Sequence, residues 1–281
     1  MRWIGIGVVC LALLGGCAST PDRVSIESDR VNPSPQTSAG TASVLSERAG
    51  QRPTPQGPGA PSGGALVMLE RNAQEGLPQG WEPWILHPSK RKTRYETRGR
   101  NGDTVVWAHA DSAASGLARR VNLEPTALPW IEWRWRVDAL VPGADNTDRH
   151  AEDSPVRIVL AFDGDRARLP FRDQLFFEQA RLLSGGQEMP YATLMYIWEN
   201  RQPVETVITN PNTGRVRKIV VASGPDGVGT WQQYRRNIVE DYRRAFGSDP
   251  GRLIGIAILT DTDNTREKAS AQYGKIRLLE R

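Results

Sequence analysis

Apolar and polar side chains alternate along most of the chain after about residue 65. The alternation is clearest in IEWRWRVD, residues 131–138, where bulky apolar side chains at odd positions alternate with charged ones at even positions. This period of two predicts a strand with one buried face. Similar runs cover residues 93–98, 104–110, 116–123, 156–163, 193–200, 217–223, 253–261 and 273–279. Many strands joined by Gly, Pro and Asn turns predict a mainly β fold, a two-sheet antiparallel sandwich of jelly-roll type.

Two segments have helical spacing, and both apolar stripes are interpreted as core packing. The first helix is expected to begin at Pro170, which suits a first turn, and to stop at Gly185-Gly186. Its inward side chains would be Phe171, Leu175, Ala180 and either Leu182 or Leu183. The stripe of the second helix would be Trp231, Tyr234, Ile238, Tyr242, Ala245 and Phe246. Glu240 and Arg244 are spaced to pair across one turn of that helix.

The chain opens with a short apolar run. Residues 3–14 are too few for a membrane span of about 20 residues, but they suit the core of a secretory signal. The run ends in LGGC, which resembles the lipobox of bacterial lipoproteins, so residues 1–16 are expected to be a signal peptide and Cys17 to carry lipid. An ordinary signal with a chance cysteine is the alternative. Ala18, where an Asp would resemble an inner-membrane retention signal, favours the outer membrane, facing the periplasm.

A tether and one domain are expected to follow. Residues 17–64 are rich in Pro, Ser, Gly and charge, so they cannot bury enough apolar surface and are predicted to be disordered. Residues 65–281 are predicted to form a single β-sandwich domain. Cys10 lies in the predicted signal, which leaves the mature chain without a cysteine pair for a disulfide. The tether suits a partner away from the membrane or serves as a spacer.

Charge and motifs exclude several function classes. The chain has 36 Lys and Arg against 32 Asp and Glu, a formal charge of +4. The densest basic cluster, residues 90–94, lacks the interleaved aromatics of a nucleic-acid site, so no nucleic-acid partner is expected. A basic surface would suit anionic envelope polymers or be a solvated face. The sequence contains no phosphate-binding loop, nucleophile elbow or His-Glu-x-x-His motif. His87, His109 and His150 are far apart along the chain.

The acidic stretch LTDTDNT, residues 259–265, is the main candidate for chemistry. It does not match an EF-hand loop, because position six from Asp261 is Arg266 and position twelve is Gln272. Asp261 and Asp263 remain candidate ligands for Ca²⁺ in another geometry. The carboxylates that would complete such a site are Asp145, Asp148, Glu152 and Asp153.

A lane of small side chains leads to this stretch. In IGIAILTD the bulky Ile side chains occupy one face, and Gly255, Ala257, Leu259 and Asp261 occupy the other. Small side chains leave room for a ligand or a neighbouring strand. The strand ending in Trp198-Glu199-Asn200 also runs into polar groups, and an aromatic plane beside carboxylates and amides suits a sugar, although core packing is the alternative for each Trp. Glu199 with Asp261 or Asp263, or Glu132, would be the carboxylates for glycoside hydrolysis.

Seven stretches in order resemble the bacterial domain-of-unknown-function family 3047. They are GWEPW, SGLARRVNL, WIEWRWRVD, EDSPVRIVLAFD, the long run from TLMYIWEN to VVASGP, GTWQQYRRNIVEDYRRAFG, and IGIAILTDTDNT with ASAQYGKIRL. The resemblance covers nearly all of residues 75–279 and implies no established activity. The C-terminal part also looks like the end of carbohydrate-binding jelly-rolls. Relatives are expected to have an Asp where this chain has Lys275, which puts any role of that Asp in doubt here.

Together these features predict an envelope lipoprotein that binds glycan or another envelope polymer at a sheet edge. The predicted ligand-binding residues are Arg157, Trp198, Glu199, Asn200, Asp261, Asp263 and Asn264. Two alternatives stay open. One is a periplasmic hydrolase that acts on glycan with paired carboxylates, and the other is a structural or assembly lipoprotein without a small ligand.

Overall fold

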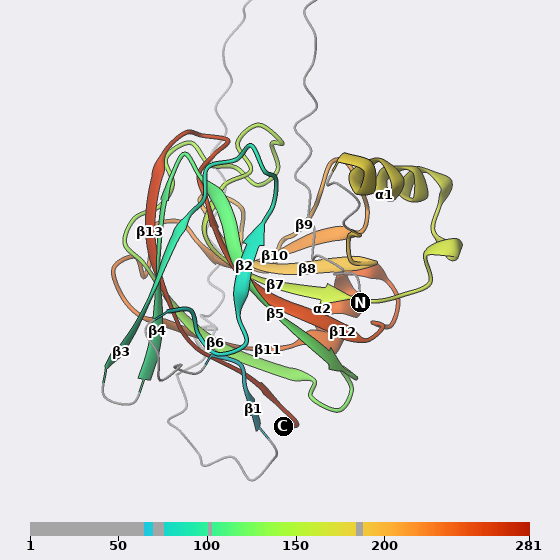
Figure 1. Ribbon diagram of the computed structural model, residues 1–281, viewed down its shortest axis with the longest axis horizontal. Helices are drawn as coiled ribbons and strands as arrows, with labels where there is room; N and C mark the ends of the chain where they lie inside the picture. Colours follow the sequence, from blue (N-terminus) through green and yellow to red (C-terminus); the bar gives the residue numbers. More distant parts are fainter. Residues whose placement is uncertain (1–64, 70–75, 101–102, 184–187) are drawn as a thin grey trace, which may run out of the picture. The chain divides into compact units, whose positions relative to one another are not determined.

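The structure is a computed structural model that describes residues 65–69, 76–100, 103–183 and 188–281 (Figure 1). The predicted signal peptide, the predicted lipidation site Cys17 and the predicted tether over residues 17–64 lie outside the described residues. No helix within the described ranges combines the length and the apolar composition that crossing a membrane requires.

Two sheets form the sandwich. The six-stranded sheet has the spatial order β11 (Gln232–Asn237), β6 (Trp130–Val137), β13 (Lys268–Leu279), β4 (Asp103–Asp111) and β3 (Arg94–Arg100), and β1 (Ala65–Val67) also pairs with β13. The order of the seven-stranded sheet is β2 (Glu82–Ile85), β5 (Ala114–Leu123), β12 (Leu253–Asp261), β7 (Ser154–Phe162), β8 (Ala192–Glu199), β10 (Val216–Ser223) and β9 (Val207–Thr209). Strands β4 to β7 alternate between the sheets, and β12 and β13 then insert between earlier strands.

This topology confirms the mainly β, two-sheet sandwich of jelly-roll type, with one correction. Strand β10 runs parallel to β8, whereas the other described strand pairs are antiparallel. The chain between β8 and β10 includes β9, which runs back along the sheet and forms an antiparallel pair with β10. The return through β9 brings β10 into the sheet in the same direction as β8, so the pairing is mixed rather than wholly antiparallel.

The two sheets differ in how their outer faces are covered. Between the sheets lies the main core, which includes Trp133 and Trp135 of β6 with Ile158 of β7 and Tyr196 of β8. A second apolar cluster covers the other face of the seven-stranded sheet, where Ala257 and other strand residues contact helix α1 (Phe171–Leu183). Strands β7 and β8 are therefore buried at every position. Strand β6 instead alternates between buried and half-buried residues, so its outer face is open.

Helix α1 lies where the sequence predicts it, but its inward face was predicted wrongly. Phe177 and Ala180 are buried, whereas Phe171, Leu175 and Leu182 are 79%, 47% and 71% exposed. Asp173 on the buried side accepts a hydrogen bond from Thr213 Oγ1 at 2.8 Å, which holds this side against the sandwich. The side of the helix that carries Phe171 is turned away. Ala180 is the one correctly predicted inward residue among those whose side chains the structure describes.

The second predicted helix begins later than expected. Helix α2 spans Ile238–Phe246, and the preceding Gln232–Asn237 forms β11 at the edge of β6. Tyr234 packs against Trp133 and Trp135 from this strand, at ring separations of 5.2 Å. Asn237 ends the strand and caps the helix, because its Oδ1 accepts hydrogen bonds from the amides of Val239 and Glu240. Arg244 pairs with Glu205 and Asp241 rather than with Glu240.

Candidate functional site

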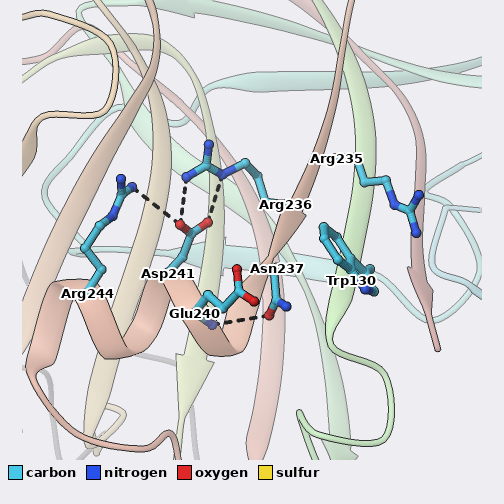
Figure 2. A pocket seen from close by; sticks show the side chains of 7 residues that line it. All are labelled: Trp130, Arg235, Arg236, Asn237, Glu240, Asp241 and Arg244. Atoms are coloured by element: carbon cyan, nitrogen blue, oxygen red, sulfur yellow. Dashed lines mark hydrogen bonds and ion pairs between the residues drawn. The ribbon is translucent and has the colours of Figure 1, made fainter. Parts of the chain in front are cut away.

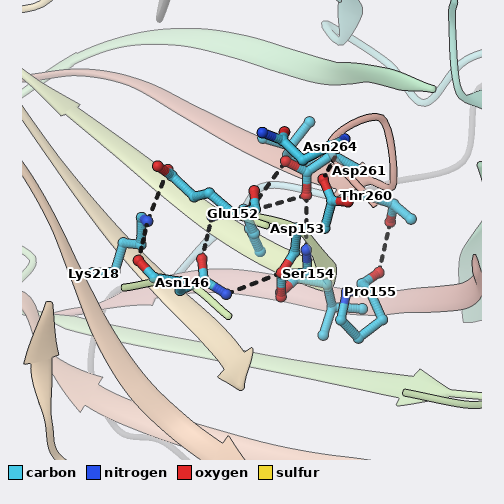
Figure 3. A network of polar contacts seen from close by, with 12 residues as sticks. Asn146, Glu152, Asp153, Ser154, Pro155, Lys218, Thr260, Asp261 and Asn264 are labelled. Atoms are coloured by element: carbon cyan, nitrogen blue, oxygen red, sulfur yellow. Dashed lines mark hydrogen bonds and ion pairs between the residues drawn. The ribbon is translucent and has the colours of Figure 1, made fainter. Parts of the chain in front are cut away.

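Several residues predicted to bind a ligand gather at one end of the seven-stranded sheet, where Asp261 and Asn264 lie beside Asp153 (Figure 3). Arg157, Glu199 and Asp261 are on strands β7, β8 and β12, and all three side chains alternate with residues of the main core. They therefore lie on the outer face of the sheet, beside the second apolar cluster. The loop 138–153, which joins β6 to β7, contributes Asn146 to the same group.

Hydrogen bonds connect these side chains into one network. Arg157 binds Asp261 with two donors, Nε to Oδ1 at 3.0 Å and Nη2 to Oδ2 at 3.1 Å. Its Nη1 donates to Asn146 Oδ1 at 3.1 Å, and Asn146 Nδ2 donates to Glu199 Oε2 at 2.6 Å. Ser154 links the same strands, because its Oγ donates to the carbonyl of Trp198 and its amide to Asp261 Oδ1. The predicted convergence of the three segments is therefore present.

The network also contains groups that the sequence analysis did not assign. Lys218 of β10 is fully buried, and its Nζ lies 2.7 Å from Glu152 Oε1 and donates to the Asn146 carbonyl at 3.1 Å (Figure 3). The position of this lysine inside the apolar run RKIVVA could have predicted a buried acidic or carbonyl partner, because an interior ammonium group needs one.

Burial bears on the prediction that a polymer binds at this cluster, which stays a prediction. Arg157, Trp198, Glu199 and Asp261 are each at most 3% exposed, so a ligand at the surface cannot contact them in this conformation. Asn200 and Asn264 are more exposed but bind the backbone carbonyls of Val141 and Arg149. These contacts tie both amides to the 138–153 loop. The cluster therefore holds that loop onto the sheet.

The acidic loop contains three carboxylates close enough to share a cation. Asp153, Asp261 and Asp263 each offer an oxygen within 4.8 Å of the others. Side chains of the protein already supply positive charge there, because Lys90 Nζ lies 2.5 Å from Asp263 Oδ2 and Arg157 binds both oxygens of Asp261. Ca²⁺ binding at Asp261 and Asp263 stays a prediction.

The same surroundings perturb the acidity of Asp261. Burial raises the pKa of this carboxyl group to about 6, against the attraction of Arg157, and the nearby Asp153 and Asp263 raise it further. Asp153 is also held by the backbone amides of Asn264 and Thr265 and by the Thr265 hydroxyl. The sequence DTDNT therefore closes a turn over buried carboxylates.

An open groove lies on the opposite side of the sandwich, on the outer face of the six-stranded sheet. Its volume is about 670 Å³. The lining residues are Arg98, Gly99, Asp103, Val105, Trp107, Arg134, Arg136, Trp231 and Gln272. They come from β3, β4, β6 and β13 and from the residue before β11, so the groove crosses several strands. Arg134 and Arg136 of β6 face it, as the alternation along that strand predicts.

Two pairs of an arginine and a tryptophan shape this groove. The Arg98 guanidinium lies 4.5 Å from the centre of the Trp107 ring, and that of Arg134 lies 4.7 Å from the centre of the Trp231 ring. Gly274 of β13 makes room for the second pair, because a Cβ atom there would lie 2.8 Å from Arg134 Nε and 3.3 Å from the Trp231 ring. Lys275, the next residue, is exposed at a β-bulge and is not a lining residue.

The groove combines aromatic rings and guanidinium groups with one carboxylate. Tryptophan rings offer apolar faces, and guanidinium groups donate paired hydrogen bonds to carboxylates or phosphates. Hydrolysis uses two carboxyl groups about 5 to 10 Å apart. Of the described lining residues, Asp103 alone carries a carboxylate, and it is paired with Arg134. Glu132 lies further along β6 and binds Arg277 through Oε2 at 2.6 and 3.1 Å.

The histidines have separate local partners. His87 contacts Ser89, His109 contacts Ser270, and His150 accepts a hydrogen bond from the neighbouring Arg149. His109 also stacks beside Trp107 at a ring separation of 6.3 Å, close to the groove. These contacts give each histidine a structural role of its own.

Comparisons with known proteins show the family and a distant structural likeness. A family described as "Protein of unknown function (DUF3047)" matches residues 79–277. No curated protein matches the chain.

Three solved structures illustrate the structural likeness, which is too distant to transfer a residue or an activity. The xyloglucanase domain of NopAA from Sinorhizobium fredii has 7% identity and a TM-score of 0.38, with 75% of this chain and 96% of that chain covered. Endoglucanase 3 of Trichoderma harzianum has 10% identity and a TM-score of 0.38, over 76% and 96% of the two chains. A family 29 carbohydrate-binding module from Piromyces equi has 10% identity and a TM-score of 0.27, over 77% and 91%.

Proposed function

The chain belongs to the DUF3047 family, whose description names no activity, and we propose from its geometry that it binds a cell-envelope glycan in the outer groove. One observation carries this proposal. Two tryptophans and three arginines line a single open groove on the sheet face that nothing else in the described structure covers. Aromatic and arginine side chains at the centre of a concave surface are the residues that most often dominate binding energy.

The charges in the groove favour a glycan that carries acidic groups. Arg98, Arg134 and Arg136 line it with one carboxylate, Asp103. Further carboxylates lie at its margins, with Glu96 bound to Arg98 and Asp138 at 3.6 Å from Arg136. Exposed ion pairs of this kind contribute little, so a carboxylate or phosphate of a ligand can replace them at small cost. The leader that resembles a lipobox would place this groove in the periplasm, among such polymers.

Peptidoglycan provides a direct test, because muramic acid residues without a stem peptide carry a free carboxyl group and the stem peptides carry carboxyl groups of their own. The purified protein would be incubated with peptidoglycan sacculi, and the bound fraction measured by sedimentation. We expect Trp107→Ala and Trp231→Ala each to weaken retention at least about fivefold, the loss that corresponds to more than about 1 kcal/mol.

Two controls separate the groove from the rest of the surface. Phe171→Ala removes an exposed aromatic ring from α1, and Arg168→Ala removes an exposed cation outside the groove. Both should leave retention unchanged. Retention that persists in the Trp107→Ala/Trp231→Ala double variant, or that falls equally in the controls, would overturn the proposal.

A further inference from the structure

A second hollow lies on the same outer face, where β6 and β11 meet helix α2 (Figure 2). Its volume is about 350 Å³, and its lining residues are Trp130, Arg235, Arg236, Asn237, Glu240, Asp241 and Arg244. Trp130 and Arg134 occupy even positions of β6, so both face outward, one into the hollow and the other into the groove. A separation of four residues along a strand places Trp130 and Arg134 about 13 Å apart.

The hollow contains polar groups with unused hydrogen-bonding capacity. Asn237 Oδ1 is engaged in capping α2, which leaves its Nδ2 as a donor. Among the described residues, the Glu240 carboxylate has neither an ion pair nor a hydrogen-bond donor. Trp130 forms one side of the hollow, and the Arg235 guanidinium lies 4.6 Å from the centre of its ring. An aromatic ring, a free amide donor and a free carboxylate acceptor therefore surround a space of ligand size.

The other arginines of the hollow are already engaged. Arg236 binds both oxygens of Asp241 at 2.7 and 2.8 Å and both oxygens of Glu205. Arg244 pairs with the same two carboxylates. Arg235 lies 3.5 Å from Glu132, which Arg277 also holds. Because the three arginines of the hollow are paired and Glu240 is free, the hollow suits a neutral sugar whose hydroxyl groups donate to the carboxylate and accept from the amide.

We infer that this hollow is a second sugar subsite and that the ligand is an extended glycan chain running along β6. The inference rests on the proposed function of the groove. An acidic sugar would bind at Arg98, Arg134 and Arg136, and a neutral sugar further along the chain would bind at Trp130. Because the two positions are about 13 Å apart along one strand, a short fragment can fill one of them and only a longer chain can fill both.

Chain length is the variable that tests this inference. Soluble peptidoglycan strands of two, four and eight sugars would be titrated calorimetrically into the purified protein. The eight-sugar strand should bind at least about tenfold more tightly than the two-sugar fragment, as expected when a second subsite is added within one ligand. Trp130→Ala and Glu240→Ala should each reduce this gain and leave the affinity for the two-sugar fragment unchanged. Trp107→Ala should weaken the binding of every length.

The Glu240→Ala variant protects the test against misfolding. It changes an exposed position in the first turn of α2, so a melting curve matching the unchanged protein shows that the fold is intact. Two results would overturn the inference while the groove proposal stands. One is equal affinity for the two-sugar and eight-sugar strands, and the other is undiminished tighter binding of the eight-sugar strand by both Trp130→Ala and Glu240→Ala. Absence of binding at every length would overturn both.

Discussion

The two outer faces of the sandwich use the same residue types for different purposes. On the seven-stranded sheet the 138–153 loop and α1 cover the face, and Arg157 is 2% exposed with each donor group engaged by Asp261, Asn146 or the Glu152 carbonyl. On the six-stranded sheet the face is open, and Arg134 and Arg136 line a groove with two tryptophans. The same residue types are therefore buried on the covered face and accessible to solvent on the open one, and residue type alone does not decide which.

Whether a sheet face is covered also determines how much stability is lost when a side chain on it is removed. A charge left alone in the interior costs several kcal/mol, because neither water nor a partner solvates it. An exposed arginine loses little when its partner is removed, because water replaces the contact. Substitutions on the covered face should therefore change stability, and substitutions on the open face should change binding.

The largest expected effect is the loss of Arg157. Arg157→Ala leaves the buried Asp261 carboxylate without its two guanidinium bonds, and we expect the free energy of unfolding to fall by about 3–5 kcal/mol. Urea unfolding followed by tryptophan fluorescence measures this change. Arg136→Ala on the open face is the matched control and should cost no more than about 1 kcal/mol. Equal losses in the two variants would remove the distinction between the faces.

The next effect concerns pH. The pKa of Asp261 is raised to about 6 in the folded protein from an ordinary value near 3.8, so the folded state holds this proton more readily than the unfolded state. The contribution of Asp261 to stability is therefore fully present below about pH 4 and is lost as pH rises through 6, a change on the order of 2–3 kcal/mol.

Comparison with Asp261→Asn isolates this titration from the other carboxyl groups. The unfolding free energy of the unchanged protein minus that of the variant should fall between pH 4 and pH 6. Hydrogen bonds from Arg98 and Thr147 lower the pKa values of Glu96 and Asp145. These two groups affect the unfolding free energies of both proteins equally, so their effects cancel in the difference. A difference that rises over this interval would show that Arg157 outweighs burial at Asp261.

A smaller effect is expected at Gly274, on the open face. Gly274→Ala introduces a Cβ atom 2.8 Å from Arg134 Nε, and the flexible arginine can move away at a stability cost of about 1 kcal/mol or less. Because the moved guanidinium no longer lies over Trp231, binding to sacculi should weaken about threefold to tenfold. Gly214→Ala, whose nearest side-chain atoms would be 3.9 Å away, is the control. Unchanged binding would mean that the position of Arg134 is irrelevant to the ligand.

The smallest effect is expected from calcium. Lys90 and Arg157 already balance the carboxylates of the acidic loop, so millimolar Ca²⁺ or a chelator should shift the melting temperature by less than about 1 °C. Thermal melts of the unchanged protein and of Lys90→Met test this expectation. A rise of about 4 °C or more with Ca²⁺ would show that an ion displaces the lysine, as the composition of DTDNT first suggested.

The strands were the most predictable part of the fold, because their alternation follows directly from one buried face. The helix faces were less predictable. Phe171 and Leu175 have core-like spacing, yet contact with the seven-stranded sheet is made by Phe177 and Ala180. Residues 232–237 fit a helical period as well as a strand, and pairing with the edge of β6 decides between them.

The candidate site was predicted only in part, for a physical reason. The convergence of Arg157, Glu199 and Asp261 could be inferred from strand ends, but their burial depends on an irregular loop that has no period in the sequence. Part of the open groove could be predicted from the sequence, because Arg134 and Arg136 project from the polar face of an alternating strand. Trp231 was interpreted as a core residue of the second helix and Trp107 was not singled out, and the space that Gly274 provides for Arg134 depends on the pairing of β13 with β6.

The central claim is that the open face of the six-stranded sheet binds glycan and the covered cluster does not. Retention of the Trp107→Ala/Trp231→Ala protein on peptidoglycan sacculi, with its melting temperature recorded in parallel, tests this most directly. We predict retention reduced at least about tenfold with a melting temperature within about 4 °C of the unchanged protein. Undiminished retention by the folded double variant would contradict the account.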